Sequence, residues 1–269
     1  ELAENLEEGN WLQAATGIMT TDTRPKIASR RFEVAGASVT ITGIAKGAGM
    51  IQPNMATMLS YIATDAKCDP ALLKELLMGA AEKSFNRITV DSDTSTNDSC
   101  MLTATGASGV DLSVDATRDI FLVELTSLMI ELAQGVIRDA EGATKFVAVT
   151  VEAGPSNDVC LEIAYAIANS PLMKTAIFAS DANWGRIVMA IGKAKVDIDI
   201  KKLDIYIGDV CLMSGGGKAP DYTEASGAKV MEDVEITITV RLNAGDCQQT
   251  VWTSDLSHEY VRINAEYRT

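Results

Sequence analysis

The segment Lys46–Asn54 is a loop between two strand patterns, and it constrains the fold more than any other stretch of the chain. Upstream of it, Ser38–Ala45 alternates polar and apolar residues, which is typical of a half-buried strand. Downstream, the apolar run Met58–Ala63 predicts a second strand. The two glycines of the loop permit backbone angles that other residues rarely adopt, and its proline stiffens the approach to the second strand. The pattern therefore predicts two strands joined by a specialised loop.

Thr57 follows the small residue Ala56 at the end of this loop. If the Ala56–Thr57 bond is broken, Thr57 gains a free α-amino group with a reference pKa of about 7.7–8.0. That amine can act as the base that activates the neighbouring hydroxyl, which is a weak nucleophile on its own. In self-cleavage, the Thr57 hydroxyl would attack the Ala56 carbonyl and convert the peptide into an ester, which water then opens. An ordinary threonine at the start of a strand is the alternative, and the Ala-Thr pair alone does not decide between the two.

Several blocks of the chain, taken in order, resemble the ornithine acetyltransferase family, also called glutamate N-acetyltransferase of arginine biosynthesis. The blocks are Ala14–Lys26, Lys46–Leu59, Thr89–Asp98, Glu141–Lys145, Asn183–Arg186 and Ile263–Thr269. Each block alone is a weak signal, but the similarity runs from about Glu8 to the last residue. The resemblance implies the fold of that family, a layered α/β/β/α sandwich related to the autoprocessing aminopeptidases.

The resemblance also implies a two-step acetyl transfer. Thr57 would take the acetyl group from N2-acetyl-L-ornithine, giving an acetyl-enzyme and free ornithine, and L-glutamate would then accept the acetyl group. A covalent intermediate of this kind predicts ping-pong kinetics. No cofactor is implied. Some family members use acetyl-CoA as a further acetyl donor, and the motifs of this chain do not separate them from the others.

Six positions match substrate-contacting residues of the family: Thr20, Lys46, Thr57, Glu141, Asn264 and Thr269. Both substrates carry a carboxylate, which the Lys46 ammonium can neutralise, and Glu141 can pair with a substrate ammonium group. Thr21 is the neighbour of Thr20, so a shift of one residue in the match would exchange them. Without the resemblance, Lys46 would be an ordinary surface lysine and Glu141 part of a simple helix end.

The oxyanion of acyl transfer needs hydrogen-bond donors, and losing one such donor in other enzymes costs about 2.7–4 kcal/mol. In the family these donors come from a threonine-glycine pair upstream of Ala14–Lys26, and this chain has no counterpart of it. Thr16-Gly17 has the right residue types but belongs to a different block. The resemblance therefore implies a companion N-terminal fragment that supplies the pair, and a heterotetramer of two α and two β fragments.

Helical and strand patterns alternate along the chain, which predicts an α/β protein. Helices are expected at 1–11, 70–83, 116–139, 158–168 and 183–193. Strands are expected at 38–45, 58–63, 87–90, 101–105, 145–152, 173–178, 196–200, 203–207, 234–242 and 251–254. The expected division is 1–56 as the end of the α fragment and 57–154 and 155–269 as the β fragment, with a weak boundary near Gly154-Pro155.

Composition excludes several classes of function. The net charge of −14 argues against binding to nucleic acid or to an anionic membrane. No apolar run reaches the length of about 20 residues that a transmembrane helix needs. Five widely spaced cysteines indicate reduced thiols.

The acidic segment Asp91–Asp98 lacks the glycine and terminal glutamate of a calcium loop, so no metal is expected. The expected compartment is the cytoplasm, or an organelle matrix in a eukaryote.

Two other functions remain open at this stage. One is an aminopeptidase or amidase of the same fold, which would deliver the acyl group to water and release acetate without glutamate. The other is an inactive binding fragment, suggested by the missing oxyanion pair. Lys46, Glu141 and the ending Asn264–Thr269 follow the transferase pattern, which favours the transferase over both alternatives.

Overall fold

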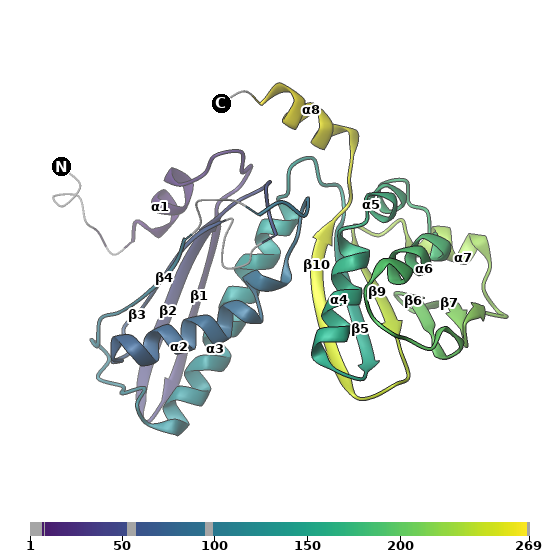
Figure 1. The fold of residues 1–269 in the computed structure, drawn as a ribbon. Helices are drawn as coiled ribbons and strands as arrows, with labels where there is room; N and C mark the ends of the chain where they lie inside the picture. Colours follow the sequence, from purple (N-terminus) through teal and green to yellow (C-terminus); the bar gives the residue numbers. More distant parts are fainter. Residues whose placement is uncertain (1–6, 8, 53–57, 95–98, 268–269) are drawn as a thin grey trace. The chain divides into compact units, whose positions relative to one another are not determined.

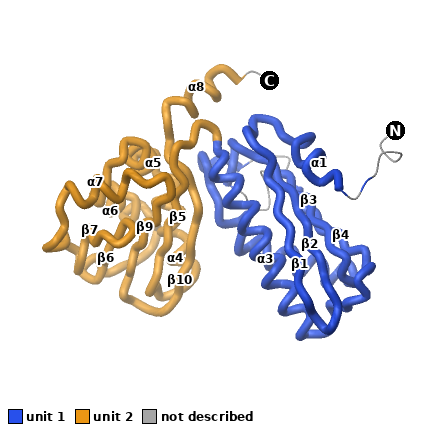
Figure 2. Tube along the Cα trace, turned by 180° about the vertical axis from the view of Figure 1, so that it is seen from behind, with its two compact units in different colours: residues 1–140 blue, residues 141–269 orange. Residues whose placement is uncertain are grey.

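A computed structural model of the chain describes residues 7, 9–52, 58–94 and 99–267. The chain forms two compact units, residues 1–140 (unit 1) and 141–269 (unit 2), each with its own β-sheet (Figures 1 and 2). Helices cover the sheets, so the predicted α/β class is confirmed.

Unit 1 contains a four-stranded sheet in the order β1-β2-β3-β4. Its strands are β1 (Lys26–Val34), β2 (Ala37–Lys46), β3 (Leu59–Thr64) and β4 (Ser99–Ala104). Its helices are α1 (Trp11–Gly17), α2 (Pro70–Glu82), the 3-10 helix η2 (Phe85–Arg87) and α3 (Asp115–Arg138). The strands β1, β2 and β3 are antiparallel, whereas β3 and β4 are parallel, and α2 lies in the crossover that a parallel pair requires.

The β1–β2 hairpin has a two-residue turn, Ala35-Gly36, in which both residues have positive φ angles of 52° and 78°. Turns of this kind match the right-handed twist of paired strands. Helix α3 packs closely against one face of the sheet because Gly43 of β2 has no side chain. A Cβ atom there would lie 3.1 Å from Leu128 and Leu132 of α3. Figure 1 shows α2 and α3 side by side on this face.

Helix α3 corrects the expectation about membrane spans. Among the described residues it is the one helix that is long and apolar enough to cross a membrane, with 24 residues and a mean hydropathy of 1.7 in its best window. Two glutamates interrupt its apolar sequence, which is why no uninterrupted run is visible. Its buried side chains, including Phe121, Leu125 and Leu128, form one face that contacts β1 and β2, as in the core helix of a globular unit.

Unit 2 contains a six-stranded sheet in the order β10-β5-β9-β6-β7-β8. Its strands are β5 (Phe146–Gly154), β6 (Asp204–Ile207), β7 (Val210–Ser214), β8 (Gly217–Lys218), β9 (Glu235–Arg241) and β10 (Cys247–Ser254). Its helices are α4 (Asn157–Ala168), α5 (Pro171–Phe178), α6 (Trp184–Lys193), the 3-10 helix η3 (Ile200–Lys202), α7 (Glu224–Val230) and α8 (His258–Glu266). The weak boundary expected near Gly154-Pro155 does not coincide with the division into units, because β5 pairs with β9 and β10 within unit 2.

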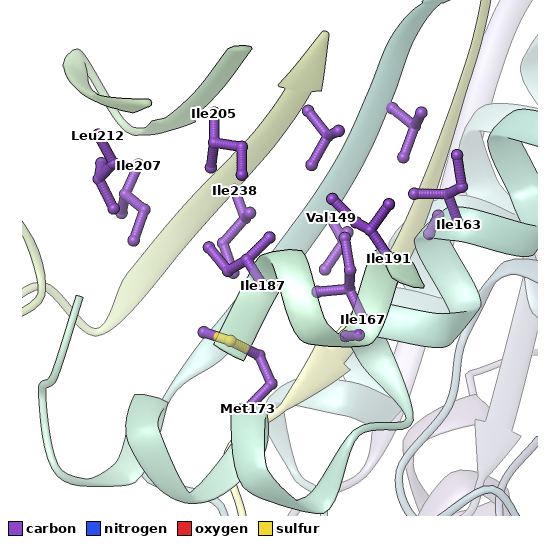
Figure 3. Packing of buried hydrophobic residues seen from close by; sticks show 14 of the residues in the cluster. Val149, Ile163, Ile167, Met173, Ile187, Ile191, Ile205, Ile207, Leu212 and Ile238 are labelled. Atoms are coloured by element: carbon purple, nitrogen blue, oxygen red, sulfur yellow. The ribbon is translucent and has the colours of Figure 1, made fainter. Parts of the chain in front are cut away.

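The core of unit 2 forms between its helices and one face of the sheet. Ile163 and Ile167 of α4 and Ile187 and Ile191 of α6 meet strand residues such as Ile238 (Figure 3). Burying an aliphatic side chain of this size stabilises a fold by about 1.5–3 kcal/mol. This continuous layer explains why the helices of unit 2 fold onto the sheet.

Several expected elements are wrong. The segment 173–178 lies in α5, a helix that begins with Pro171 and is capped by the Ser170 hydroxyl, which accepts from the Met173 N–H. Residues 87–90 and 196–200 do not form strands. Of the helix expected at 1–11, residues 1–6 and 8 lie outside the described residues, and α1 begins at Trp11. The sequence patterns also missed β1, β7, β8, α7, α8 and the two 3-10 helices η2 and η3. The other expected helices and strands are present, with ends shifted by a few residues.

Candidate active site

The predicted site residues fall in both units. Thr20 and Lys46 lie in unit 1, and Glu141 and Asn264 lie in unit 2. Ala56, Thr57 and Thr269 lie outside the described residues. The structure therefore shows how Thr20 and Lys46 are held in unit 1 and how Glu141 and Asn264 are held in unit 2.

In unit 1, one carboxylate joins the segments that carry Thr20 and Lys46. Thr20 is exposed and lies between α1 and β1, whereas Lys46 ends β2. The Thr20 N–H donates to Asp22 Oδ2 at 3.1 Å, and the N–H of Gly47 donates to Asp22 Oδ1 at 2.8 Å. The Lys46 side chain is half-buried at the end of β2.

Asp22 belongs to a buried network of three charged side chains. Lys26 Nζ donates to a carboxylate oxygen of Asp22 and to one of Asp139, and it lies 3.3 Å from the carbonyl oxygen of Gly47. The side chains of Lys26, Asp22 and Asp139 are only 3%, 0% and 3% exposed. Burial acts to raise the pKa of Asp22, but hydrogen bonds from Gly47, Lys26 and Thr20 outweigh it and hold that pKa below its ordinary value. The Asp22 carboxyl is therefore ionised at neutral pH.

A second carboxylate, Asp91, holds the loop that leads toward Ala56–Thr57. The N–H groups of Met50 and Ile51 donate to the two oxygens of Asp91 at 2.8 and 2.9 Å. Met50 has a φ of 55°, an uncommon angle for a residue other than glycine. The Asp91 carboxylate therefore fixes an unusual backbone conformation shortly before the predicted cleavage bond.

The described part of the acidic segment, Asp91–Thr94, holds the neighbouring loop through hydrogen bonds. Asp91 accepts backbone hydrogen bonds from the neighbouring loop, and the Thr94 hydroxyl donates to the carbonyl of Gln52 at 3.0 Å. No group of three His, Cys, Asp or Glu side chains that could hold a metal ion occurs in the part of the chain that the structure describes. Residues 95–98 lie outside that part, and the absence of a metal stays a prediction.

In unit 2, the structure brings Glu141 and Asn264 together although 123 residues separate them. The Asn264 side-chain amide donates to Glu141 Oε2 at 2.9 Å and to the carbonyl of Tyr260 at 3.0 Å. Glu141 lies in the turn that precedes β5, and Asn264 lies on α8. The amide leaves the other oxygen of Glu141 for a ligand, so this pair can present a fixed negative charge.

The Glu141 turn and α8 are held together by residues that the sequence analysis missed. Asp255 is 4% exposed, and its Oδ1 accepts from the N–H groups of Thr144 and Lys145 at 2.8 and 2.9 Å. The Ser257 hydroxyl caps the start of α8 and donates to the carbonyl of Gly142. Ser257 followed by an acidic residue in the first turn is a helix-start signal that could have revealed α8. Nothing in the local sequence indicates the role of Asp255.

Replacing Gly142 with alanine is expected to destabilise unit 2 by about 2–4 kcal/mol. Gly142 has a φ of 66°, and a Cβ atom there would lie 2.4 Å from the backbone nitrogen of Tyr260. The side chain would therefore be strained and would push α8 away from the Glu141 turn. Chemical denaturation of the variant and the wild type measures the loss in free energy of unfolding.

Gly192→Ala is the matched control for this substitution. Gly192 lies in α6, and nothing lies within 4 Å of the position of its added Cβ. Alanine is the better helix former, so this variant should be as stable as the wild type or slightly more stable. Equal stabilities of the two variants would contradict the steric argument for Gly142.

Comparison with known protein families gives a match over the whole chain. The ArgJ family model matches residues 1–269. The arginine biosynthesis bifunctional protein ArgJ of Pseudomonas fluorescens (strain Pf0-1) is 55% identical over 270 residues, covering 99% of this chain and 67% of that protein. The protein of the same name from Psychrobacter arcticus is 52% identical, covering 98% of this chain and 66% of that protein. The chain thus spans about two thirds of the length of these relatives.

A solved structure supports the same similarity. The crystal structure of the arginine biosynthesis bifunctional protein argJ from Bacillus halodurans superimposes with a TM-score of 0.72 at 34% sequence identity. The match covers 76% of this chain and 96% of that one. The similarity therefore extends to the three-dimensional fold.

Proposed function

Because the chain belongs to the ArgJ family, we propose that it is an acetyltransferase of arginine biosynthesis. In this proposal it transfers the acetyl group of N2-acetyl-L-ornithine to L-glutamate through an acetyl ester on Thr57. Thr57 becomes the N-terminal residue of a β fragment when the Ala56–Thr57 bond cleaves itself. The relatives named above are bacterial, which favours the cytoplasm as the compartment.

The observation that carries the proposal is the hydrogen-bonded pair of Glu141 and Asn264, which holds a carboxylate at a predicted substrate position within unit 2. N2-acetyl-L-ornithine has one carboxylate and one side-chain ammonium group. In the proposal the Lys46 ammonium binds the carboxylate, and the Glu141 carboxylate, oriented by Asn264, binds the ammonium. Thr20 and Thr269 complete the proposed set of contacts.

The proposed reaction divides the transfer into two displacements. The Thr57 hydroxyl attacks the acetyl carbonyl while the α-amine of Thr57 accepts the hydroxyl proton. The carbon–nitrogen bond of acetylornithine then breaks, and the departing ornithine amine takes that proton. In the second half, the neutral glutamate amine attacks the acetyl ester, the α-amine of Thr57 takes the proton that this nitrogen loses, and it passes the proton to the Thr57 oxygen as the ester bond breaks.

Three further parts of the proposal lie outside this chain or its described residues. A companion N-terminal fragment supplies the oxyanion donors, and the fragments assemble as a heterotetramer of two α and two β fragments. Acetyl-CoA serves as a candidate second donor, and no cofactor takes part.

Denaturing mass spectrometry of the intact protein, with and without N-acetylornithine, tests the proposal. We expect two pieces that separate between Ala56 and Thr57, with one acetyl group added to the piece that begins with Thr57. Addition of glutamate should remove the acetyl group and yield N-acetylglutamate. Release of acetate without glutamate would instead indicate a hydrolase of the same fold, and a single unmodified species would favour an inactive binding fragment.

A further inference from the structure

The carboxylate of Asp22 is shared by two backbone segments that each carry a proposed substrate contact. Its Oδ2 accepts from the N–H of Thr20, and its Oδ1 accepts from the N–H of Gly47, the residue next to Lys46. The two distances are 3.1 and 2.8 Å. The separation between the Thr20 and Lys46 segments is therefore set by the width of a single carboxylate.

Only an ionised carboxylate can accept hydrogen bonds from Thr20, Gly47 and Lys26 at the same time. Lys26 Nζ also donates to Oδ1, so the three donors use both oxygens of Asp22. The Asp22 side chain is 0% exposed, which means that water cannot replace a lost partner easily. An amide at this position would offer one acceptor oxygen in place of two and would turn its NH2 group toward other donors.

Asp139 provides a natural comparison within the same network. It also binds Lys26 and is also buried, with a side chain that is 3% exposed. However, it accepts from the N–H and hydroxyl groups of Thr23 rather than from Thr20 or Gly47. The two carboxylates therefore share an electrostatic environment and differ in the backbone that they hold.

We propose that Asp22 is a positioning residue for acetyl transfer, which fixes the spacing of the Thr20 and Lys46 contacts around the carboxylate end of the substrate. Asp22 acts through the backbone of these two segments and does not itself contact the substrate. This inference rests on the proposed function, since it takes Thr20 and Lys46 as substrate contacts.

The test compares Asp22→Asn with Asp139→Asn in the intact protein. Hydrogen exchange of the Thr20 and Gly47 amides should become faster in D22N, whereas D139N should leave both amides protected. The KM for N-acetylornithine should rise about tenfold in D22N. This is the effect expected when displacement of the Lys46 segment removes one hydrogen bond to the charged carboxylate of the substrate. The rate of acetyl-enzyme formation at saturating substrate should change less, and melting temperatures of both variants show whether their losses of stability are similar.

Each outcome decides the question. Unchanged exchange of Thr20 and Gly47 in D22N would overturn the positioning role, whatever the activity. An equal rise of KM in D139N would also overturn it, because the effect would then follow from the shared charges or from stability. Faster exchange in D22N with no change in KM would separate the two segments from substrate binding and overturn the inference. If the wild type forms no acetyl adduct, the proposed function fails, and the link from Asp22 to the substrate fails with it. The exchange data then still show whether Asp22 holds the Thr20 and Gly47 amides.

Discussion

Replacing Thr57 with alanine is expected to leave the chain uncleaved and to abolish acetyl transfer. The substitution removes the oxygen that attacks the Ala56 carbonyl, so the ester intermediate of self-cleavage cannot form. It also removes the acceptor of the acetyl group, and an intact chain keeps the α-amine of residue 57 within a peptide bond. Loss of a covalent nucleophile lowers turnover by on the order of 10³-fold or more in other enzymes. Denaturing mass spectrometry and an assay of N-acetylglutamate measure both effects.

Two further variants show whether the effect belongs to this hydroxyl. Thr57→Ser keeps a hydroxyl and an amine in the same places, so it should still cleave and transfer, at a lower rate. Thr103→Ala removes a threonine from an exposed position on β4 and should behave as the wild type does. A Thr57→Ala protein that forms the acetyl adduct at the native rate would eliminate Thr57 as the nucleophile and the proposed mechanism with it.

The framework around the Thr57 loop was predictable because its signals are local. The alternation in 38–45 and the apolar run in 58–63 correctly predicted β2 and β3. The periodic apolar positions of 116–139 likewise predicted α3. The prediction failed where the segment was short. The six residues 173–178 are compatible with a strand or a helix, and the helix-start signals Ser170 and Pro171 indicate the helix that is observed.

The hydrogen bonds and ion pairs that hold the candidate site residues were not predictable, because they join residues that are distant in the sequence. Lys26 meets Asp139 across 113 residues, and the N–H of Thr144 meets Asp255 across 111 residues. No periodicity or spacing connects such pairs. Resemblance to the family indicated Thr20, Lys46, Glu141 and Asn264, but only the structure shows that buried carboxylates fix the backbone around them.

Lys26 carries the largest stability effect that we expect in the chain. Its ammonium group lies between the carboxylates of Asp22 and Asp139, whose side chains are 0% and 3% exposed. Replacing Lys26 with methionine keeps a side chain of similar length but leaves two buried carboxylates without this cation. Breaking a buried ion pair in this way typically costs 3–5 kcal/mol, so we expect a loss of about that size in the free energy of unfolding at pH 7.

The pH dependence of the Lys26→Met variant identifies the cause of this loss. In the wild type the pKa of Asp22 is lowered, so its contribution to stability is present above the pKa of an unfolded aspartate and is lost as the pH falls through the folded value. In the variant, burial of Asp22 is no longer offset by Lys26, which should raise the pKa of Asp22, so that the folded state binds protons more tightly than the unfolded state. The deficit in the free energy of unfolding should therefore shrink as the pH is lowered from 7 to 5, as measured by urea denaturation at each pH.

Lys67→Met is the control. Lys67 pairs with Asp111 at the surface, so its replacement should change stability little at any pH. A deficit that is constant with pH would indicate lost packing rather than two uncompensated carboxylates.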